Sequence, residues 1–354
     1  MTPHEQQPLD FLKTFIETPS PSGYETPVQR LFAERVKPFS DSVTRDVLGN
    51  VVAVRNGGGR PRVLLAGHSD EVGLMVKHVS DEGFVYCATV GSPAIPGLIG
   101  QPVEILGRAG AVPGVVMARR PVGDEALVYK IDGCWIDIGA RDKKDALAAV
   151  RPGDPATPVA GFRALRGDRV MGRGFDDRLG VYVIAEVLRR LHGASFEAAV
   201  YGVSTTQEEV GSRGAEPCTY AIDPDIGIAV EVTAATDCPE TNKKTQGDIA
   251  LGGGPVLLRG ANIHPALGAL LEETAQRHAI PYQVDGFPGP TPTDASKMQM
   301  TRGGVATALV KVPLRYMHFP QEVVSLGDVE HAISLLVHLV ASLRKGMDFR
   351  QPLE

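Results

Sequence analysis

The sequence predicts a mixed α/β protein in which a smaller β-barrel-like domain interrupts a larger one. The run 62–67 is apolar, rich in β-forming residues and followed by polar residues, as in a buried strand of an open sheet. Over 73–170, short alternating runs separated by glycine and proline are typical of a small all-β unit. After Asp176 the pattern alternates between helix and strand, which favours an α/β sheet. The expected domains are therefore 1–72 with 171–354, and the insertion 73–170.

The larger domain is predicted element by element from periodicity and turn residues. Apolar residues at helical spacing predict a helix at 10–17, and the Pro19 to Gly23 segment ends it with turn-forming residues. Leu48-Gly-Asn50 predicts a hairpin turn between short strands. The later helices are expected near 179–191, 265–278 and 328–343, and the later strands near 198–204, 226–231 and 306–312.

Composition narrows the class of protein. The 354 residues are 43% hydrophobic and 22% charged, enough for a globular chain with a large core. A net charge of −6 without a basic cluster argues against a nucleic-acid partner, and no apolar run approaches the roughly 20 residues that cross a bilayer. The first residues lack a signal-peptide pattern, so we expect a cytoplasmic protein with no membrane partner. Cys87, Cys134, Cys218 and Cys238 have no C-x-x-C spacing and are expected to be reduced thiols.

The paired acids Glu208 and Glu209 are the first candidates for chemistry. They follow the predicted strand 198–204 and so lie at its carboxyl end, where open α/β sheets place their sites. Adjacent carboxylates repel each other, and a positive partner such as a metal ion is needed to hold them together in a fold. The alternative is a pair of solvated loop acids.

Four further segments carry candidate metal ligands. His68 ends a predicted strand with Asp70 two residues later, and Asp176 begins a paired-acid segment at a strand-to-helix transition. Taken singly, an uninvolved histidine and a helix N-cap aspartate remain open as alternatives. Glu231 ends an apolar strand, and His318 follows the strand that ends at Pro313. Together these residues predict two imidazoles and several carboxylates at one edge of one sheet, a set that suits a pair of divalent cations.

Eight segments of the chain, taken in order, resemble the tetrahedral (TET) aminopeptidases, the glutamyl aminopeptidase-like family of di-zinc metallopeptidases. The matching segments are Pro21–Glu25, Asp46–Asn50, Gly67–Met75, Asp137–Gly139, Phe175–Arg178, Thr206–Gly211, Thr293–Ala295 and Arg315–His318. They span almost the whole chain. The resemblance implies a zinc-peptidase-like αβα sandwich with an inserted, PDZ-like β domain.

The resemblance also implies a role for each candidate residue. His68 and Glu231 would bind one metal ion, Glu209 and His318 the other, and Asp176 would bridge both, while Glu208 would be the general base and Asp70 would orient His68. The peptide bond between Asp176 and Asp177 is expected to be cis.

The implied activity is that of a metal-dependent aminopeptidase acting on short peptides. Two divalent cations, zinc above all with cobalt or manganese also compatible, would activate a bridging hydroxide, and Glu208 would accept its proton. The implied partners are peptide substrates and further copies of the chain, from a dimer up to a tetrahedral dodecamer. The inserted domain would serve oligomerisation and substrate access.

Three positions depart from the family pattern. Glu231 stands where many relatives have aspartate, Phe319 where a small residue is usual, and Pro292 where glycine is usual. The last two bear on specificity more than on catalysis.

Three alternatives remain open at this point. They are a di-metal deacylase, a glycan hydrolase of the same fold, and a non-catalytic metal-binding assembly protein. Glycoside hydrolysis normally needs two metal-free carboxylates, and a purely structural metal site needs no spare acid such as Glu208.

Overall fold

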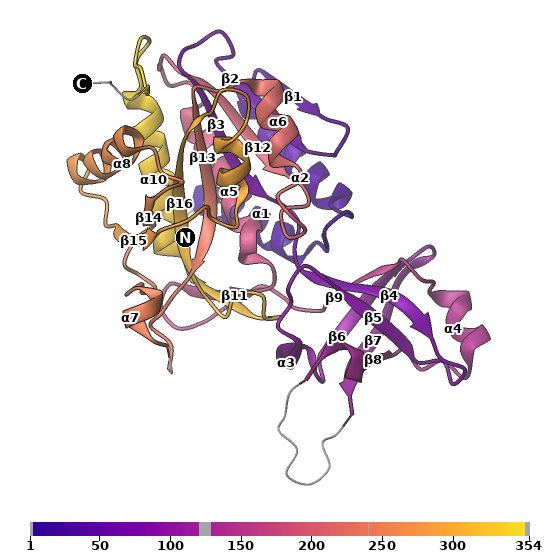
Figure 1. Ribbon diagram of the computed structural model, residues 1–354. Coiled ribbons are helices and arrows are strands. Elements are labelled where there is room, and N and C mark those ends of the chain that lie inside the picture. The colour runs from indigo at the N-terminus through magenta and orange to yellow at the C-terminus, as the bar shows by residue number, and fades with distance from the viewer. Residues whose placement is uncertain (1–2, 120–128, 240, 351–354) are drawn as a thin grey trace.

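The chain folds into a large sheet flanked by helices and a separate small barrel (Figure 1). The structure is a computed structural model that describes residues 3–119, 129–239 and 241–350. The large sheet has 11 strands, and the barrel closes in the order β4-β5-β8-β7-β6-β9. A mixed α/β protein with an inserted barrel is what the sequence pattern predicts.

The large sheet has a parallel centre. Its strands are β1 (Ser42–Arg45), β2 (Val51–Arg55), β3 (Arg62–His68), β10 (Arg163–Ala164), β11 (Arg169–Gly172), β12 (Ala199–Thr205), β13 (Ile226–Ala234), β14 (Val256–Gly260), β15 (Gln283–Phe287), β16 (Ala306–Arg315) and β17 (Glu322–Ser325). They are ordered β1-β2-β12-β3-β13-β16-β17-β11-β10, with β14 beside β16 and β15 beside β14. Because β12, β3, β13 and β16 are mutually parallel, their carboxyl ends meet at one edge of the sheet.

Helices cover both faces of this sheet. They are α1 (Pro3–Glu17), α2 (Thr26–Val36), α5 (Phe175–Leu191), α6 (Ala215–Ile222), α7 (Lys243–Gln246), α8 (Pro265–Arg277), α9 (Asp294–Gln299) and α10 (Leu326–Ser342). Successive side chains of a strand point to opposite faces. In β3, Val63 and Leu65 accordingly join the core formed with α5, whereas Leu64 and Ala66 join a second core with Cys218 of α6. The sheet is therefore the middle layer of an αβα sandwich.

The barrel has its own apolar core. Its strands are β4 (Gly73–Val79), β5 (Val85–Val90), β6 (Pro102–Gly107), β7 (Gly110–Ala118), β8 (Cys134–Asp137) and β9 (Pro155–Pro158), with helices α3 (Ile95–Leu98) and α4 (Lys143–Ala149) beside them. Val76, Val103, Ile105 and Ile136 fill its interior.

The carboxyl boundary of the barrel lies earlier than the sequence suggests. The sequence interpretation extended the insertion to residue 170, but β10 and β11 lie in the large sheet. Val170 packs into the main core because β11 pairs with β17.

The limits of one helix and one strand near the candidate site also differ from the sequence prediction. Helix α5 begins at Phe175 rather than near Leu179, with non-helical backbone at Asp176 and Asp177 and the expected cis peptide bond between them. Strand β16 extends to Arg315. In the described parts of the chain, every helix is too short or too polar to cross a bilayer.

Candidate active site

The candidate residues meet at the carboxyl edge of the parallel strands. His68 ends β3, Glu231 lies near the end of β13, Glu208 and Glu209 follow β12, His318 follows β16, and Asp176 lies in the first turn of α5. The topology of the sheet thus brings together acids and histidines from five distant parts of the sequence.

Asp176 lies between the two imidazoles. Its Oδ1 is 3.2 Å from Nε2 of His68, and its Oδ2 is 3.2 Å from Nε2 of His318. Glu231 forms a group with His68 and Asp176, and Glu209 forms a group with Asp176 and His318; within each group the potential ligand atoms lie within 4.8 Å of one another. One carboxylate is therefore shared by two groups, each of which could hold a metal ion.

The chemistry of these side chains fits a divalent cation. Oε1 of Glu209 and Oε1 of Glu231 are buried and have no hydrogen-bond partner. Burial, followed by repulsion from neighbouring acids such as Asp176, raises the pKa of both carboxyls. Buried carboxylates need a compensating charge, and imidazole and carboxylate ligands suit zinc. The additional methylene of Glu231 does not remove it from its group.

The ring of His68 is oriented by Asp70. Nδ1 of His68 lies 3.0 Å from the main-chain oxygen of Asp70 and 3.5 Å from its Oδ1. The resemblance implies that Asp70 orients His68, and of the two oxygens of Asp70 near the ring the main-chain oxygen is the nearer acceptor. A proton on Nδ1 leaves Nε2 free to face Asp176. Burial lowers the pKa of His68, but contacts with Asp176 and Asp70 outweigh burial and raise the pKa overall.

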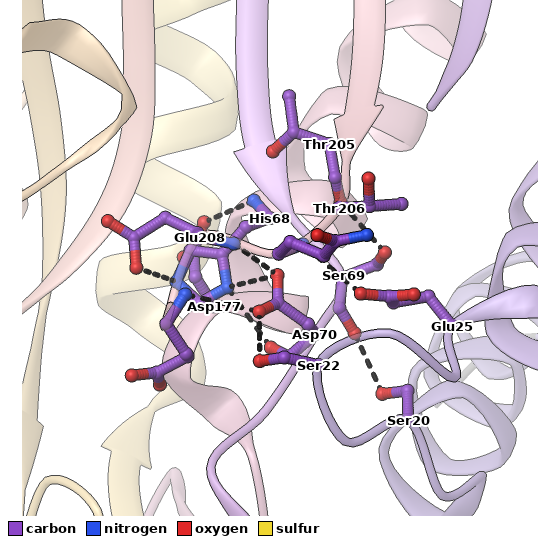
Figure 2. A network of polar contacts seen from close by, with 12 residues as sticks. Ser20, Ser22, Glu25, His68, Ser69, Asp70, Asp177, Thr205, Thr206 and Glu208 are labelled. Carbon is purple, nitrogen blue, oxygen red and sulfur yellow. Dashed lines mark hydrogen bonds and ion pairs between the residues drawn. The ribbon is translucent and has the colours of Figure 1, made fainter. Parts of the chain in front are cut away.

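The carboxylate of Asp70 holds the paired acids in place. Its Oδ1 accepts the N–H of Glu208 at 2.9 Å, and its Oδ2 accepts the N–H of Glu209 at 3.1 Å. Ser22 donates its hydroxyl to Oδ2 at 2.6 Å. Figure 2 shows Asp70 between His68, Glu208 and Ser22. The loop after β12 is thereby fixed to the end of β3.

Glu208 lies beside these groups without belonging to either of them. Its Oε2 is 3.8 Å from Nε2 of His68, and its Oε1 accepts the hydroxyl of Ser212 at 3.0 Å. Burial raises the pKa of Glu208 to about 7, against the lowering effect of His68. It is a largely buried acid that lies next to the shared centre and outside both ligand groups.

Three further acids support the site without having been predicted as functional. Asp177 accepts the N–H of His68 at 3.2 Å, and Glu322 accepts the N–H groups of Asp176 and His318. Asp294 accepts the hydroxyl of Thr205 at 2.6 Å, and its Oδ1 is buried without a hydrogen-bond partner. Burial raises the pKa of Asp294 to about 6. In the sequence, Asp177 belongs to the paired-acid segment and Asp294 to the Thr293–Ala295 motif, so both could have been considered. No local sequence pattern indicates Glu322.

A small cavity lies beside Glu209 and His318. Leu74 and Leu98 of the barrel and Phe319 of the large domain supply apolar walls. The barrel thus contributes side chains to a cavity next to the candidate centre. Pro292, the other departure near the site, is exposed and is not part of this lining.

Comparison with known proteins agrees with this geometry. The sequence model of the family described as M42 glutamyl aminopeptidase matches residues 49–335. The chain belongs to the M42 glutamyl aminopeptidase family. The resemblance found in the sequence is thereby confirmed, and so is the prediction of an aminopeptidase.

Relatives of this M42 aminopeptidase match it over nearly the full length of both chains. The lysyl aminopeptidase of Pyrococcus furiosus is 37% identical, covering 96% of this chain and 98% of its own length. The structure of a TET aminopeptidase from a marine sediment Thaumarchaeota archaeon has a TM-score of 0.92 and 32% identity, covering 97% of this chain and 98% of the other. The Pyrococcus horikoshii TET1 peptidase has a TM-score of 0.85 and 31% identity, covering 95% of this chain and 100% of the other.

Proposed function

We propose that this M42 aminopeptidase removes N-terminal residues from short peptides at a centre that holds two divalent cations. The observation that carries this proposal is Asp176, which directs one carboxylate oxygen towards each of His68 and His318. His68 and Glu231 would hold one cation, and Glu209 and His318 the other. Zinc suits these ligands best, and cobalt and manganese are compatible with them. Bound cations of this kind acidify water and polarise a peptide carbonyl.

We assign proton transfer to Glu208. Its carboxylate lies next to His68 but outside both ligand groups. It can accept a proton from the attacking water and return it to the leaving amine. Asp70 holds the main chain of Glu208, so the carboxylate is oriented before the substrate arrives.

The cavity next to Glu209 and His318 bears on which substrate side chain the centre accepts. It is walled by Leu98 from the barrel and Phe319 from the large domain, so a substrate side chain bound beside the centre would meet apolar groups from both domains. Cleavage at the amino terminus of a peptide is supported by the M42 glutamyl aminopeptidase family and by the lysyl aminopeptidase relative.

Substitution of Glu208 tests this mechanism. We expect Glu208→Gln to bind two cations like the parent protein and to hydrolyse aminoacyl-p-nitroanilides about 10²- to 10⁴-fold more slowly, because Gln cannot accept the proton. Glu273→Gln on the exposed face of α8 is the matched control and keeps full activity. Full activity in Glu208→Gln, or loss of its cations, contradicts the role proposed for Glu208.

The proposal also covers the oligomeric state of the protein and its location in the cell. The P. horikoshii relative is described as assembling into a tetrahedron or a large octahedral shell. We extend this to the present chain as a homo-oligomer, from dimer up to tetrahedral dodecamer, with the inserted domain contributing to assembly and to substrate access. A cytoplasmic location fits the four free cysteines, since a reducing compartment preserves free thiols. Light scattering after size-exclusion chromatography measures the oligomer directly.

A further inference from the structure

Glu322 occupies a distinctive position in the sheet. It is the first residue of β17, which lies between β16 and β11. It pairs with Gly172 of β11, and the next residue pairs with Arg315 of β16. Strand β11 leads to Asp176 and strand β16 leads to His318. Glu322 therefore lies between the two segments that carry these residues.

Both oxygens of the Glu322 carboxylate accept main-chain N–H groups from these segments. Oε2 accepts the N–H of Asp176 at 3.2 Å, and Oε1 accepts the N–H of His318 at 3.0 Å. The side chain of Glu322 is almost fully buried, with 2% of the residue exposed. One buried carboxylate thus ties together the backbones of two residues whose side chains face each other.

The backbone of His318 needs such support. Its φ is 64°, in the left-handed region, which costs a non-glycine residue roughly 1 kcal/mol. The barrel supplies contacts from the other side: Nδ1 of His318 lies 3.0 Å from the main-chain oxygen of Ser92, and the N–H of Ala94 donates to the main-chain oxygen of His318 at 3.0 Å. A proton on Nδ1 is shared with Ser92, so Nε2 is left facing Asp176 and Glu209.

We propose that Glu322 is a positioning residue for the cation site formed by Asp176, Glu209 and His318, acting with the Ser92–Ala94 segment of the barrel as a two-sided clamp on His318. This inference rests on the proposed two-cation function. It gives the inserted domain a part in building the centre.

The other ligand group is held by different contacts. His68 is the last residue of β3, and its N–H donates to Asp177 rather than to Glu322. Glu231 lies within β13, where ladders to neighbouring strands fix its backbone. Asp176 is the only member of this group that contacts Glu322 in the described part of the chain. Loss of the clamp is therefore expected to weaken one cation site far more than the other.

Cation titrations of the metal-free full-length protein test the clamp. In the His68→Ala variant, only the cation site with Glu209 and His318 remains to be measured. In the His318→Ala variant, only the cation site with His68 and Glu231 remains. Glu322→Gln keeps the shape of the side chain but presents an N–H₂ group to one of the two main-chain donors. With Co²⁺ absorption as the readout, we expect Glu322→Gln to weaken binding about 10- to 100-fold in the His68→Ala background and less than about 3-fold in the His318→Ala background.

The results of these titrations distinguish failure of the clamp proposal from failure of the two-cation proposal. Equal weakening in both backgrounds, or none in either, overturns the clamp while the two-cation centre stands. A parent protein that binds no cation overturns both.

A second variant tests the barrel side of the clamp without changing a buried acid. Ala94 has a φ of −71°, which proline accepts, and Ala94→Pro replaces the N–H that donates to the main-chain oxygen of His318 with a ring carbon. The hydrogen bond is lost, and the ring carbon pushes the Ser92–Ala94 segment away from His318. We expect the same selective weakening in the His68→Ala background, and weakening of less than about 3-fold in the His318→Ala background. Unchanged Co²⁺ affinity in Ala94→Pro contradicts the part assigned to the barrel.

Discussion

At the scale of single residues, the centre is a cluster of buried acids whose charge must be balanced. Oε1 of Glu209 and Oε1 of Glu231 lack hydrogen-bond partners, and burial raises the pKa of Glu208 from its ordinary value of 4.5 to about 7. A cation bound among them favours their ionised forms. The same acids therefore destabilise the fold without metal and stabilise it with metal.

This reasoning predicts a pH dependence of stability for the metal-free protein. Because the folded-state pKa of Glu208 lies above its unfolded value, its contribution to stability is complete below about pH 4.5 and is lost as the pH rises through about 7. The loss is on the order of 3 kcal/mol for this group. Chelated protein is thus expected to melt at a lower temperature near pH 8 than near pH 5, and added zinc is expected to raise the melting temperature more near pH 8. A zinc effect that is equal at both pH values contradicts the buried-acid account.

A second residue-scale prediction concerns Phe319. Its ring fills space that Gly97 leaves open, since a Cβ at Gly97 would lie 2.6 Å from Cδ1 of Phe319. Phe319→Ser removes one wall of the cavity. We expect kcat/KM for bulky aminoacyl substrates to change about 10-fold relative to alanyl substrates, with cation content unchanged. The exposed Phe287→Ser on β15 is the control, and an unaltered substrate ratio in Phe319→Ser removes Phe319 from the specificity determinants.

At the scale of elements, the close packing of α5 on the sheet positions the first ligand group. Gly180 of α5 has no room for a side chain: a Cβ there would lie 2.1 Å from the main-chain oxygen of Val230 and 2.5 Å from Oδ2 of Asp177. Val230 precedes Glu231, and Asp177 supports His68. Any displacement of α5 is therefore transmitted to that group.

Gly180→Ala is expected to destabilise the protein by about 3 kcal/mol or more and to weaken cation binding, because overpacking forces α5 away from β13. Urea unfolding and Co²⁺ titration measure the two effects. Gly58→Ala, where a Cβ meets no atom within 4 Å, provides the neutral comparison. Parent-like stability in Gly180→Ala contradicts the close packing of α5 on β13 as the determinant of this position.

The pairing of the strands decides which site residues could be predicted from the sequence. His68 and Glu231 could be located because each follows a readable apolar run, and parallel strands bring their carboxyl ends together, although β13 itself continues to Ala234. Glu322 could not be located, because its role depends on β17 pairing with both β11 and β16, and its contacts are with main-chain groups that have no residue signature. The limit of the insertion was misplaced for the same reason, since the pairing of β11 with β17 is long-range.

At the scale of the whole molecule, the insertion and the large domain meet at the centre. Ser92, Ala94 and Leu98 belong to the barrel, yet two of them contact His318 and the third lines the adjacent cavity. The family-level resemblance predicted an inserted domain for assembly and access. The contacts add a local connection between that domain and the candidate ligands.

The central claim is that Asp176 joins two cation sites in one chain. Anomalous diffraction at the zinc edge from crystals grown with zinc tests it most directly. The account predicts two peaks per chain, one beside His68 and Glu231 and the other beside Glu209 and His318, each in contact with one oxygen of Asp176. A single peak, or two peaks of which one does not contact Asp176, contradicts it.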